Sequence, residues 1–118
     1  MANIGIVYEP TMADAADALA QIQRQNGHSI KLICRDKFPI ADAMFWFLAN
    51  LSSNFSEAFI LISGLADSNL STWISKELCM QHGMGNFATV RPVFATADAV
   101  QPWWKNQTGF IVMSTDLD

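Results

Sequence analysis

The sequence predicts a three-layer α/β sandwich around a doubly wound, five-stranded parallel sheet. Short apolar runs rich in Ile, Val and Phe alternate with helical patterns from one end of the chain to the other, which is typical of βαβ units with right-handed crossovers. The composition agrees with this prediction. A chain of 118 residues with 51% hydrophobic and 15% charged residues suits one globular domain, residues 1–118.

Five apolar runs are predicted to form the strands. The third run, Ala-Phe-Ile-Leu-Ile-Ser, has no polar alternation, which indicates burial on both faces and the central place in the sheet. Pro92 in the fourth run favours a position near an edge or a bulge, because proline has no backbone N–H to donate. The predicted strands are Ile4–Tyr8, Ile30–Cys34, Ala58–Ser63, Val90–Ala95 and Phe110–Ser114.

The first two predicted helices lie between these strands. Thr11 is expected to cap the first helix, with Asp14 three residues later in its first turn. Asn26-Gly27 ends that helix, since glycine readily adopts the left-handed conformation of a C-terminal cap. Residues 40–53 place apolar side chains at helical spacing, and Phe45 and Trp46 are expected to enlarge the buried face.

The later elements complete the predicted fold. Residues 72–82 are expected to form a helix capped by Ser71 or a neighbour, and residues 97–104 a short helix. The sequence continues for four residues after the fifth strand, so the last helix of such a fold is expected to be missing. The apolar surface then left bare, with Trp103 and Trp104 nearby, would be covered by another chain or domain.

Charge and hydropathy exclude several classes of partner. Seven Lys and Arg against eleven Asp and Glu give a net charge of -4, without a basic run, so nucleic acid is not an expected partner. No apolar run approaches the roughly 20 residues of a membrane span. The start of the chain lacks the features of a secretory signal, which predicts a cytoplasmic protein with Cys34 and Cys79 as buried free thiols.

Other uses of this architecture need residues that the chain lacks. The segment Tyr8-Glu9-Pro10-Thr11-Met12 has no glycine to form a flavodoxin-type phosphate loop. Ser63 and Ser114 occupy the places where a receiver domain needs Asp and Lys. No Walker loop, Gly-x-Ser-x-Gly elbow or His/Cys metal spacing occurs. We therefore expect no metal and no bound cofactor.

The chain contains Ser-Thr-Trp-Ile-Ser-Lys-Glu-Leu at residues 71–78, Arg-Asp-Lys-Phe-Pro at residues 35–39 and Ile-Val-Tyr at residues 6–8. Together these segments resemble Toll/interleukin receptor homology (TIR) domains, a family with a flavodoxin-like fold. Residues 71–78, Ser-Thr-Trp-Ile-Ser-Lys-Glu-Leu, look like the family's Ser-x-Trp-Cys-x-x-Glu-Leu box, and they follow a Phe-Ile-Leu-Ile-Ser strand as that box does. Residues 35–39, Arg-Asp-Lys-Phe-Pro, look like the Arg-Asp-x-x-Pro-Gly stretch of its BB loop, and residues 6–8 like the end of its first strand. Order and spacing agree over residues 4–114.

The chain also departs from the family pattern. Ile74 replaces the usual cysteine, Ile40 replaces the BB-loop glycine, and Glu9 replaces the usual serine. The resemblance nevertheless implies a site. In enzymatic members, the helix glutamate is essential for cleaving NAD to nicotinamide and ADP-ribose or a cyclic form, and it corresponds to Glu77. One carboxylate suffices for this chemistry, because nicotinamide leaves as a neutral ring and the transition state resembles an oxocarbenium ion.

The resemblance suggests further substrate contacts. Trp73 lies one helical turn before Glu77 and could stack on a substrate ring, and Ser71 at the helix start could receive a pyrophosphate oxygen. Arg35, with Asp36 beside it, could contact the phosphates. Tyr8 and Phe38 could form walls of the ring site.

Other interpretations of these residues remain open. Glu77 with Lys76 also suits a solvated helix face, Trp73 an interface anchor, and Arg35-Asp36 a surface loop pair. The chain is then an interaction module that binds itself or other TIR domains through residues 35–40, or a domain that senses a nucleotide without turnover. For the enzyme, assembly of several domains through the same loop is expected to complete the site.

Overall fold

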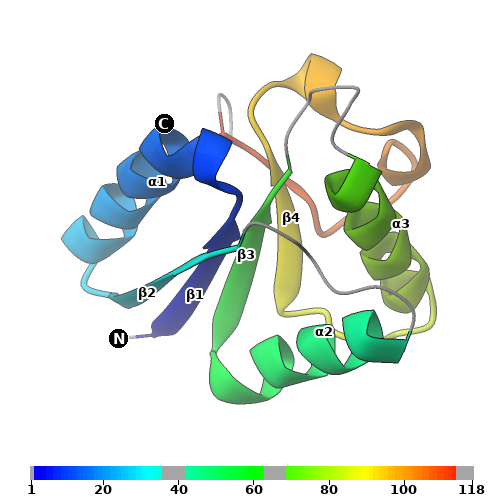
Figure 1. Cartoon of the computed structure of the whole chain (residues 1–118), viewed down its shortest axis with the longest axis horizontal. Helices are drawn as coiled ribbons and strands as arrows, with labels where there is room; N and C mark the ends of the chain where they lie inside the picture. The colour runs from blue at the N-terminus through cyan, green and yellow to red at the C-terminus, as the bar shows by residue number, and fades with distance from the viewer. Residues whose placement is uncertain (1, 36–41, 63–68, 114–118) are drawn as a thin grey trace.

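One parallel sheet forms the centre of the molecule, with its strands in the order β2-β1-β3-β4-β5 (Figure 1). The computed structural model describes residues 2–35, 42–62 and 69–113, and for residues 69–72 the backbone alone. The predicted α/β fold with five parallel strands is confirmed. The strands are β1 (Asn3–Tyr8), β2 (Ser29–Cys34), β3 (Glu57–Leu61), β4 (Val90–Phe94) and β5 (Ile111–Val112).

β3 is the central strand, as its apolar sequence predicted. It pairs in parallel with β1 through Ile6 and Phe59 and with β4 through Ile60 and Pro92, among other residue pairs. Four of its five residues are buried. Alternate side chains enter opposite sides of the sheet: Phe59 joins the cluster packed on α1, and Ile60 joins the cluster beneath α2 and α3.

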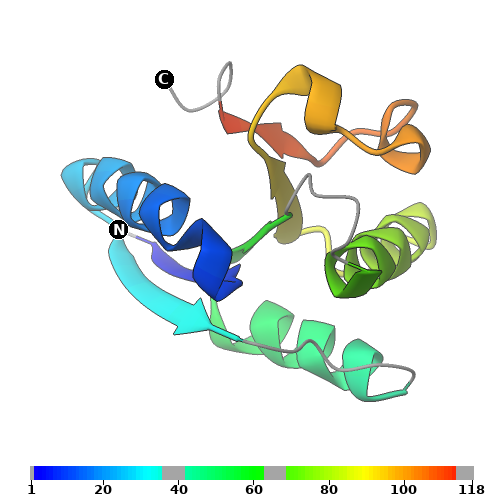
Figure 2. The same ribbon diagram turned by 45° about the horizontal axis from the view of Figure 1, so that its top comes forward.

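Helices cover the two faces unequally (Figure 2). α1 (Ala13–Gln25) lies on one face, and α2 (Asp42–Asn54) and α3 (Asn69–Gly83) lie on the other. α1 buries Leu19 against the sheet, whereas Leu48 of α2 and Leu78 of α3 enter the opposite cluster. The result is the three-layer arrangement predicted from the sequence.

Thr11 and Ser71 do not cap the helices that they were expected to begin. A 3-10 turn, Pro10–Met12, precedes α1, so Thr11 lies inside this turn and makes no side-chain cap. α3 begins at Asn69, which places Ser71 inside the helix instead of at its cap. The predicted stop of α1 is confirmed, because Gly27 has φ +89° and Asn26 forms the C-cap.

The helix predicted at residues 97–104 is replaced by two 3-10 turns, Ala97–Ala99 and Pro102–Trp104. Gln101 has extended backbone because a proline follows it, and this extended residue separates the two turns. Pro92 lies in β4, the strand next to the edge strand β5, which agrees with the predicted position near an edge. It is tolerated because the ladder to β5 contains only the pairs of Val93 and Phe94, which follow it.

Several burial predictions need correction. Cys34 is exposed, because it ends β2 at the edge of the sheet, whereas Cys79 is buried as expected. Trp104 is fully buried, so it does not mark a bare surface. Phe45 and Trp46, expected in the core, are 37% and 65% exposed on α2. Among the described residues, four of the five exposed large apolar side chains lie on α2 and α3, and the fifth, Met84, follows α3, whereas the sequence predicted a bare apolar surface near Trp103 and Trp104.

Candidate functional site

A groove lies between the beginning of α2 and the outer side of α3. Its cavity volume is about 590 Å³, within the range of about 300 to 1,000 Å³ usual for small-molecule sites. The lining combines apolar and aromatic side chains with three charged ones. The described lining residues are Asp42, Met44, Phe45, Trp73, Lys76, Glu77 and Met80.

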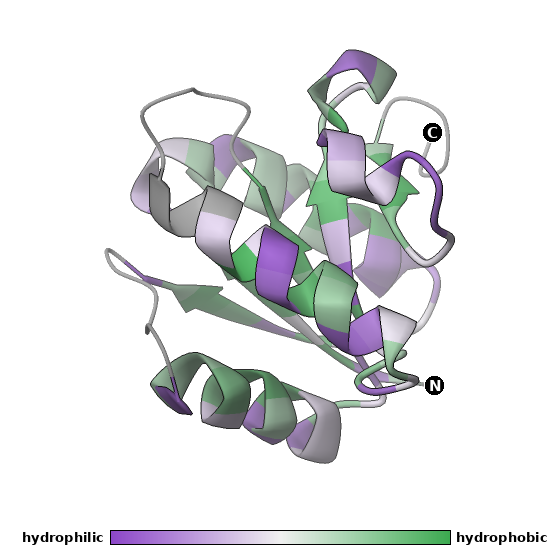
Figure 3. Cartoon of the chain, turned by 90° about the vertical axis from the view of Figure 1, so that its right-hand side faces the viewer, coloured by the Kyte–Doolittle hydropathy of each residue, from purple (hydrophilic) through white to green (hydrophobic). Residues whose placement is uncertain are grey.

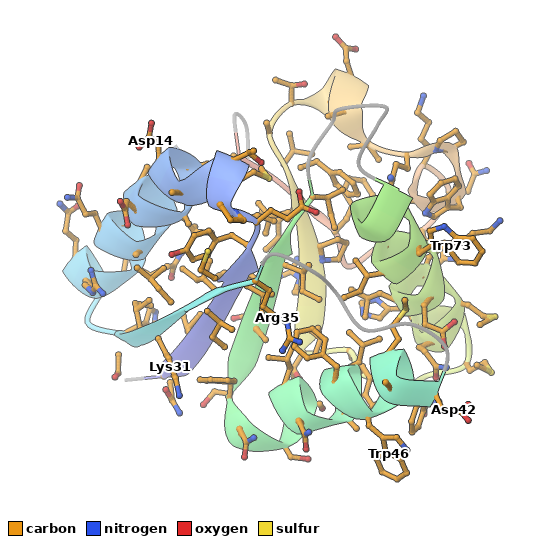
Figure 4. All side chains as sticks on the ribbon, viewed as in Figure 1. Asp14, Lys31, Arg35, Asp42, Trp46 and Trp73 are labelled. Carbon is orange, nitrogen blue, oxygen red and sulfur yellow. The ribbon has the colours of Figure 1, made fainter. Side chains whose placement is uncertain are left out.

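α3 supplies most of this lining, because one face of the helix packs on the sheet and the other faces the groove. Ile74 and Leu78 are fully buried under the helix. Trp73 and Met80 are 65% and 53% exposed on the other side, with Glu77 between them and partly exposed. Since residues four apart share a helix face, Trp73 and Glu77 lie one above the other along the groove. Figure 4 shows Trp73 pointing away from the helix.

The Glu77 carboxylate is held by its own helix. Gln81 Nε2 donates a hydrogen bond to Glu77 Oε1 over 3.2 Å. Gln81 is itself 5% exposed, and its Oε1 accepts a hydrogen bond of 3.0 Å from Asn86 Nδ2. This chain of bonds fixes one carboxylate oxygen on the inner side. The second oxygen has no such contact among the described residues.

A buried polar cluster anchors α3 from behind. The Ser75 hydroxyl bonds to Gln101 Oε1 and accepts hydrogen bonds from the indole N–H of Trp104 at 3.0 Å and of Trp103 at 3.4 Å. Trp104 also donates to the Ser75 carbonyl at 3.2 Å. The Cys79 thiol lies 3.1 Å from the Trp103 carbonyl, and burial raises its pKa. These contacts join α3 to the turn Pro102–Trp104 and hold the groove wall in place.

The charged groups of the groove are of both signs. Asp42 and Glu77 contribute carboxylates, and Lys76 contributes an ammonium group whose Nζ lies 5.7 Å from the centroid of the Trp103 ring. Such a distance allows a cation–π attraction. The groove therefore offers an aromatic surface, one acidic group from α2, and one acidic and one basic group from α3.

Tyr8 and Arg35 do not join this groove. Tyr8 packs with the cluster beneath α1, and its pKa is raised, mainly by desolvation and further by Cys34 and Asp17. The Arg35 guanidinium lies 4.9 Å from the Phe47 ring centroid, between β2 and α2, while its amide donates to the Tyr8 carbonyl. In Figure 4, Arg35 and Trp73 lie on opposite sides of α3.

The remaining predicted contacts lie outside what the structure describes. Asp36 and Phe38 belong to residues 36–41, and the Ser71 side chain belongs to the undescribed part of α3. Of the predicted site residues, the described groove unites Glu77 and Trp73. The sequence interpretation missed Asp42, Phe45 and Met80. Met80 follows Trp73 by seven residues, a helical repeat that the sequence pattern already contained.

The fold and the groove define the class of this molecule: a parallel α/β domain with a mixed aromatic and charged groove between two helices. Comparisons of the chain with protein-family models, with curated proteins and with solved structures gave no match. Among the residues described, no three His, Cys, Asp or Glu side chains gather to hold a metal ion. None of the described helices is long and apolar enough to cross a membrane.

Proposed function

We propose that this chain is a TIR-like domain that binds NAD or a related nucleotide in the α2–α3 groove. On assembly, it cleaves NAD to nicotinamide and ADP-ribose, or to a cyclic form, in signalling or defence. One observation supports the proposal above all: Glu77, the carboxylate of the TIR-like box, lines the same groove as Trp73. An indole can stack on a flat ring of the ligand, and a carboxylate beside it can bind the hydroxyls of the attached sugar.

The chemistry follows from this pair. The bond between ribose C1′ and the nicotinamide nitrogen breaks, and its electron pair leaves with neutral nicotinamide. Positive charge then spreads over C1′ and the ring oxygen, where the second oxygen of Glu77 stabilises it and holds the ribose hydroxyls. In hydrolysis, a water oxygen bonds to C1′ and releases its proton to solvent. Trp73 stacks on an aromatic ring of the substrate.

The contact to the pyrophosphate is reassigned in this proposal. Arg35 lies beside Phe47, away from the groove, so it does not serve the same ligand as Glu77. Lys76 is the cation among the described lining residues. We therefore assign the phosphate contact to Lys76, whose ammonium group needs only to leave the Trp103 ring to reach a ligand.

The test is nicotinamide release from NAD at high protein concentration with a crowding agent. Glu77→Gln is expected to lower the rate by about 10² to 10³, as loss of one group that stabilises transition-state charge does. Asp98→Asn is the matched control, because Asp98 is exposed on the turn Ala97–Ala99 and does not line the groove. Equal rates for wild type and Glu77→Gln would refute the catalytic role.

A second candidate function is a non-catalytic interaction module. The observation that favours it is the exposure of large apolar side chains on α2 and α3, Trp46 and Trp73 among them. Thermal unfolding with and without NAD separates the two candidates, since a ligand that binds the native state alone raises the melting temperature. No shift and no nicotinamide release would favour the module over the enzyme.

A further inference from the structure

The outer sides of α2 and α3 carry an unusual set of exposed apolar side chains, called here the α2–α3 surface. Their exposed fractions range from 37% to 65%. Figure 3 looks onto this side of the molecule and shows apolar segments on α3 mixed with polar ones. Figure 4 shows Trp46 and Trp73 pointing away from their helices. The members are Phe45, Trp46, Trp73, Met80 and Met84.

These side chains form one continuous surface. The rings of Phe45 and Trp46 are in edge contact, with centroids 5.5 Å apart. Phe45 lines the groove together with Trp73 and Met80, so the groove connects the two helices. Met84 lies in the turn directly after α3, where its amide donates a hydrogen bond of 3.2 Å to the Met80 carbonyl.

The exposed apolar area of the α2–α3 surface is large for a surface in contact with solvent alone. At about 200 Å² for a side chain of this size, the exposed parts amount to roughly 550 Å². That value is at the upper end of the roughly 300 to 600 Å² of the largest patch on a typical monomer. Complete burial of two such surfaces would remove at most about 1,100 Å² from solvent, close to the roughly 1,000 Å² expected of a specific interface.

We propose that the α2–α3 surface docks a second copy of this chain in a two-fold arrangement. In such an arrangement each copy presents the same patch, so the patch must complement itself. The charges around the groove satisfy this condition: Lys76 lies on a surface that also carries Asp42 and Glu77. Each ammonium group can meet a carboxylate of the other copy, although the whole chain has a net charge of -4.

Pairing through the α2–α3 surface would also cover the groove. The effect of this on nucleotide binding is the one part of the proposal that rests on the proposed function. Trp73 and Glu77 lie inside the docked surface, so a second copy covers the carboxylate that would act on NAD. Nucleotide and second copy then exclude one another, and the α2–α3 pair is a closed form, distinct from any assembly through residues 35–40.

Sedimentation velocity across the micromolar range tests the pairing without NAD. Trp46→Glu is the test variant, because Trp46 is 65% exposed and does not line the groove. Ala18→Glu adds the same charge on an exposed position of α1, on the opposite face of the sheet. Wild type and Ala18→Glu are expected to dimerise, and Trp46→Glu to weaken the dimer by about tenfold or more.

Two results would overturn the proposal. Wild type that remains monomeric throughout the range would show that the α2–α3 surface does not pair two copies of the chain. Equal dimerisation of Trp46→Glu and Ala18→Glu, both with unchanged circular dichroism, would place the dimer contact elsewhere. Nicotinamide release is measured separately and reports on the proposed function, whereas sedimentation alone decides whether the chain pairs through this surface.

Discussion

The buried cluster behind α3 should behave as one energetic unit. Ser75→Ala removes the hydroxyl that bonds to Gln101 and accepts the Trp104 indole N–H at 3.0 Å. Trp104 keeps the Ser75 carbonyl at 3.2 Å as an acceptor. The variant therefore loses the hydrogen bonds to Gln101 and from Trp104, together with the longer one from Trp103 at 3.4 Å, which we expect to cost about 1 to 3 kcal/mol of unfolding free energy.

Trp104→Phe perturbs the same contact from the other side. The indole is fully buried, so its replacement leaves roughly 40 Å³ unfilled, worth about 1 kcal/mol, in addition to the lost transfer energy. Loss of the indole N–H bond adds about 1 kcal/mol. We expect a total of about 2 to 3 kcal/mol. In the double variant the shared hydrogen bond is lost once, so the cost falls short of the sum by about 0.5 to 1 kcal/mol.

The assay is urea unfolding followed by tryptophan fluorescence and circular dichroism. Each kcal/mol corresponds to roughly 3 to 6 °C in melting temperature for a chain of this length. Ser53→Ala, on the exposed end of α2, is the matched control and should change stability by less than about 0.5 kcal/mol. Costs of Ser75→Ala and Trp104→Phe that add within about 0.3 kcal/mol would refute the coupling.

Two further predictions concern β1. A Cβ at Gly5 would lie 2.9 Å from Cδ2 and Cε2 of Phe55. Gly5→Ala should therefore lower the free energy of unfolding in urea by about 1 to 3 kcal/mol, and adding Phe55→Leu should restore part of that stability. An unchanged free energy of unfolding in Gly5→Ala would contradict the clash. The second prediction concerns Tyr8, the sole tyrosine of the chain. Its pKa is raised in the folded state, so the folded protein keeps the phenolic proton to a higher pH than the unfolded chain does. Its absorbance should titrate above the ordinary value of 10.0. Stability should fall as pH rises from that ordinary value to the midpoint of the folded state, because the unfolded state loses its proton first, and it should fall less steeply in Tyr8→Phe. A midpoint at or below the ordinary value would contradict this.

The sheet was predictable because its signal is local. An uninterrupted apolar run such as Ala58–Leu61 needs burial on both sides, and in a parallel sheet only inner strands receive it. The turns after β4 were not predictable in the same way. Apolar residues at 97–104 suggested a helix, but Pro102 imposes extended backbone on Gln101, and the buried contacts of Trp104 then stabilise two short turns.

The site was predictable only in part, for a geometric reason. The spacing of Trp73 and Glu77 places them on one helix face, so this shared face was predictable from the sequence, whereas the groove that they line depends on how α2 packs beside α3. The burial of Phe45 and Trp46 was predicted from residue type. At about 100° per residue, Trp46 lies roughly 200° from Met44, which is buried, so geometry puts it on the outer side. The distance between Arg35 and the groove depends on packing that no local pattern specifies.

Trp46 and Trp73 separate the two uses of the α2–α3 surface. Both indoles are 65% exposed, but Trp73 lines the groove and Trp46 does not. Nucleotide binding in the groove should depend on Trp73 but not on Trp46, whereas pairing with a second copy should bury both indoles. If Trp73→Ala weakens nucleotide binding and Trp46→Glu weakens only pairing, the surface serves both ligands in turn. If Trp46→Glu increases nicotinamide release at high protein concentration, pairing through α2 and α3 holds Glu77 away from its substrate.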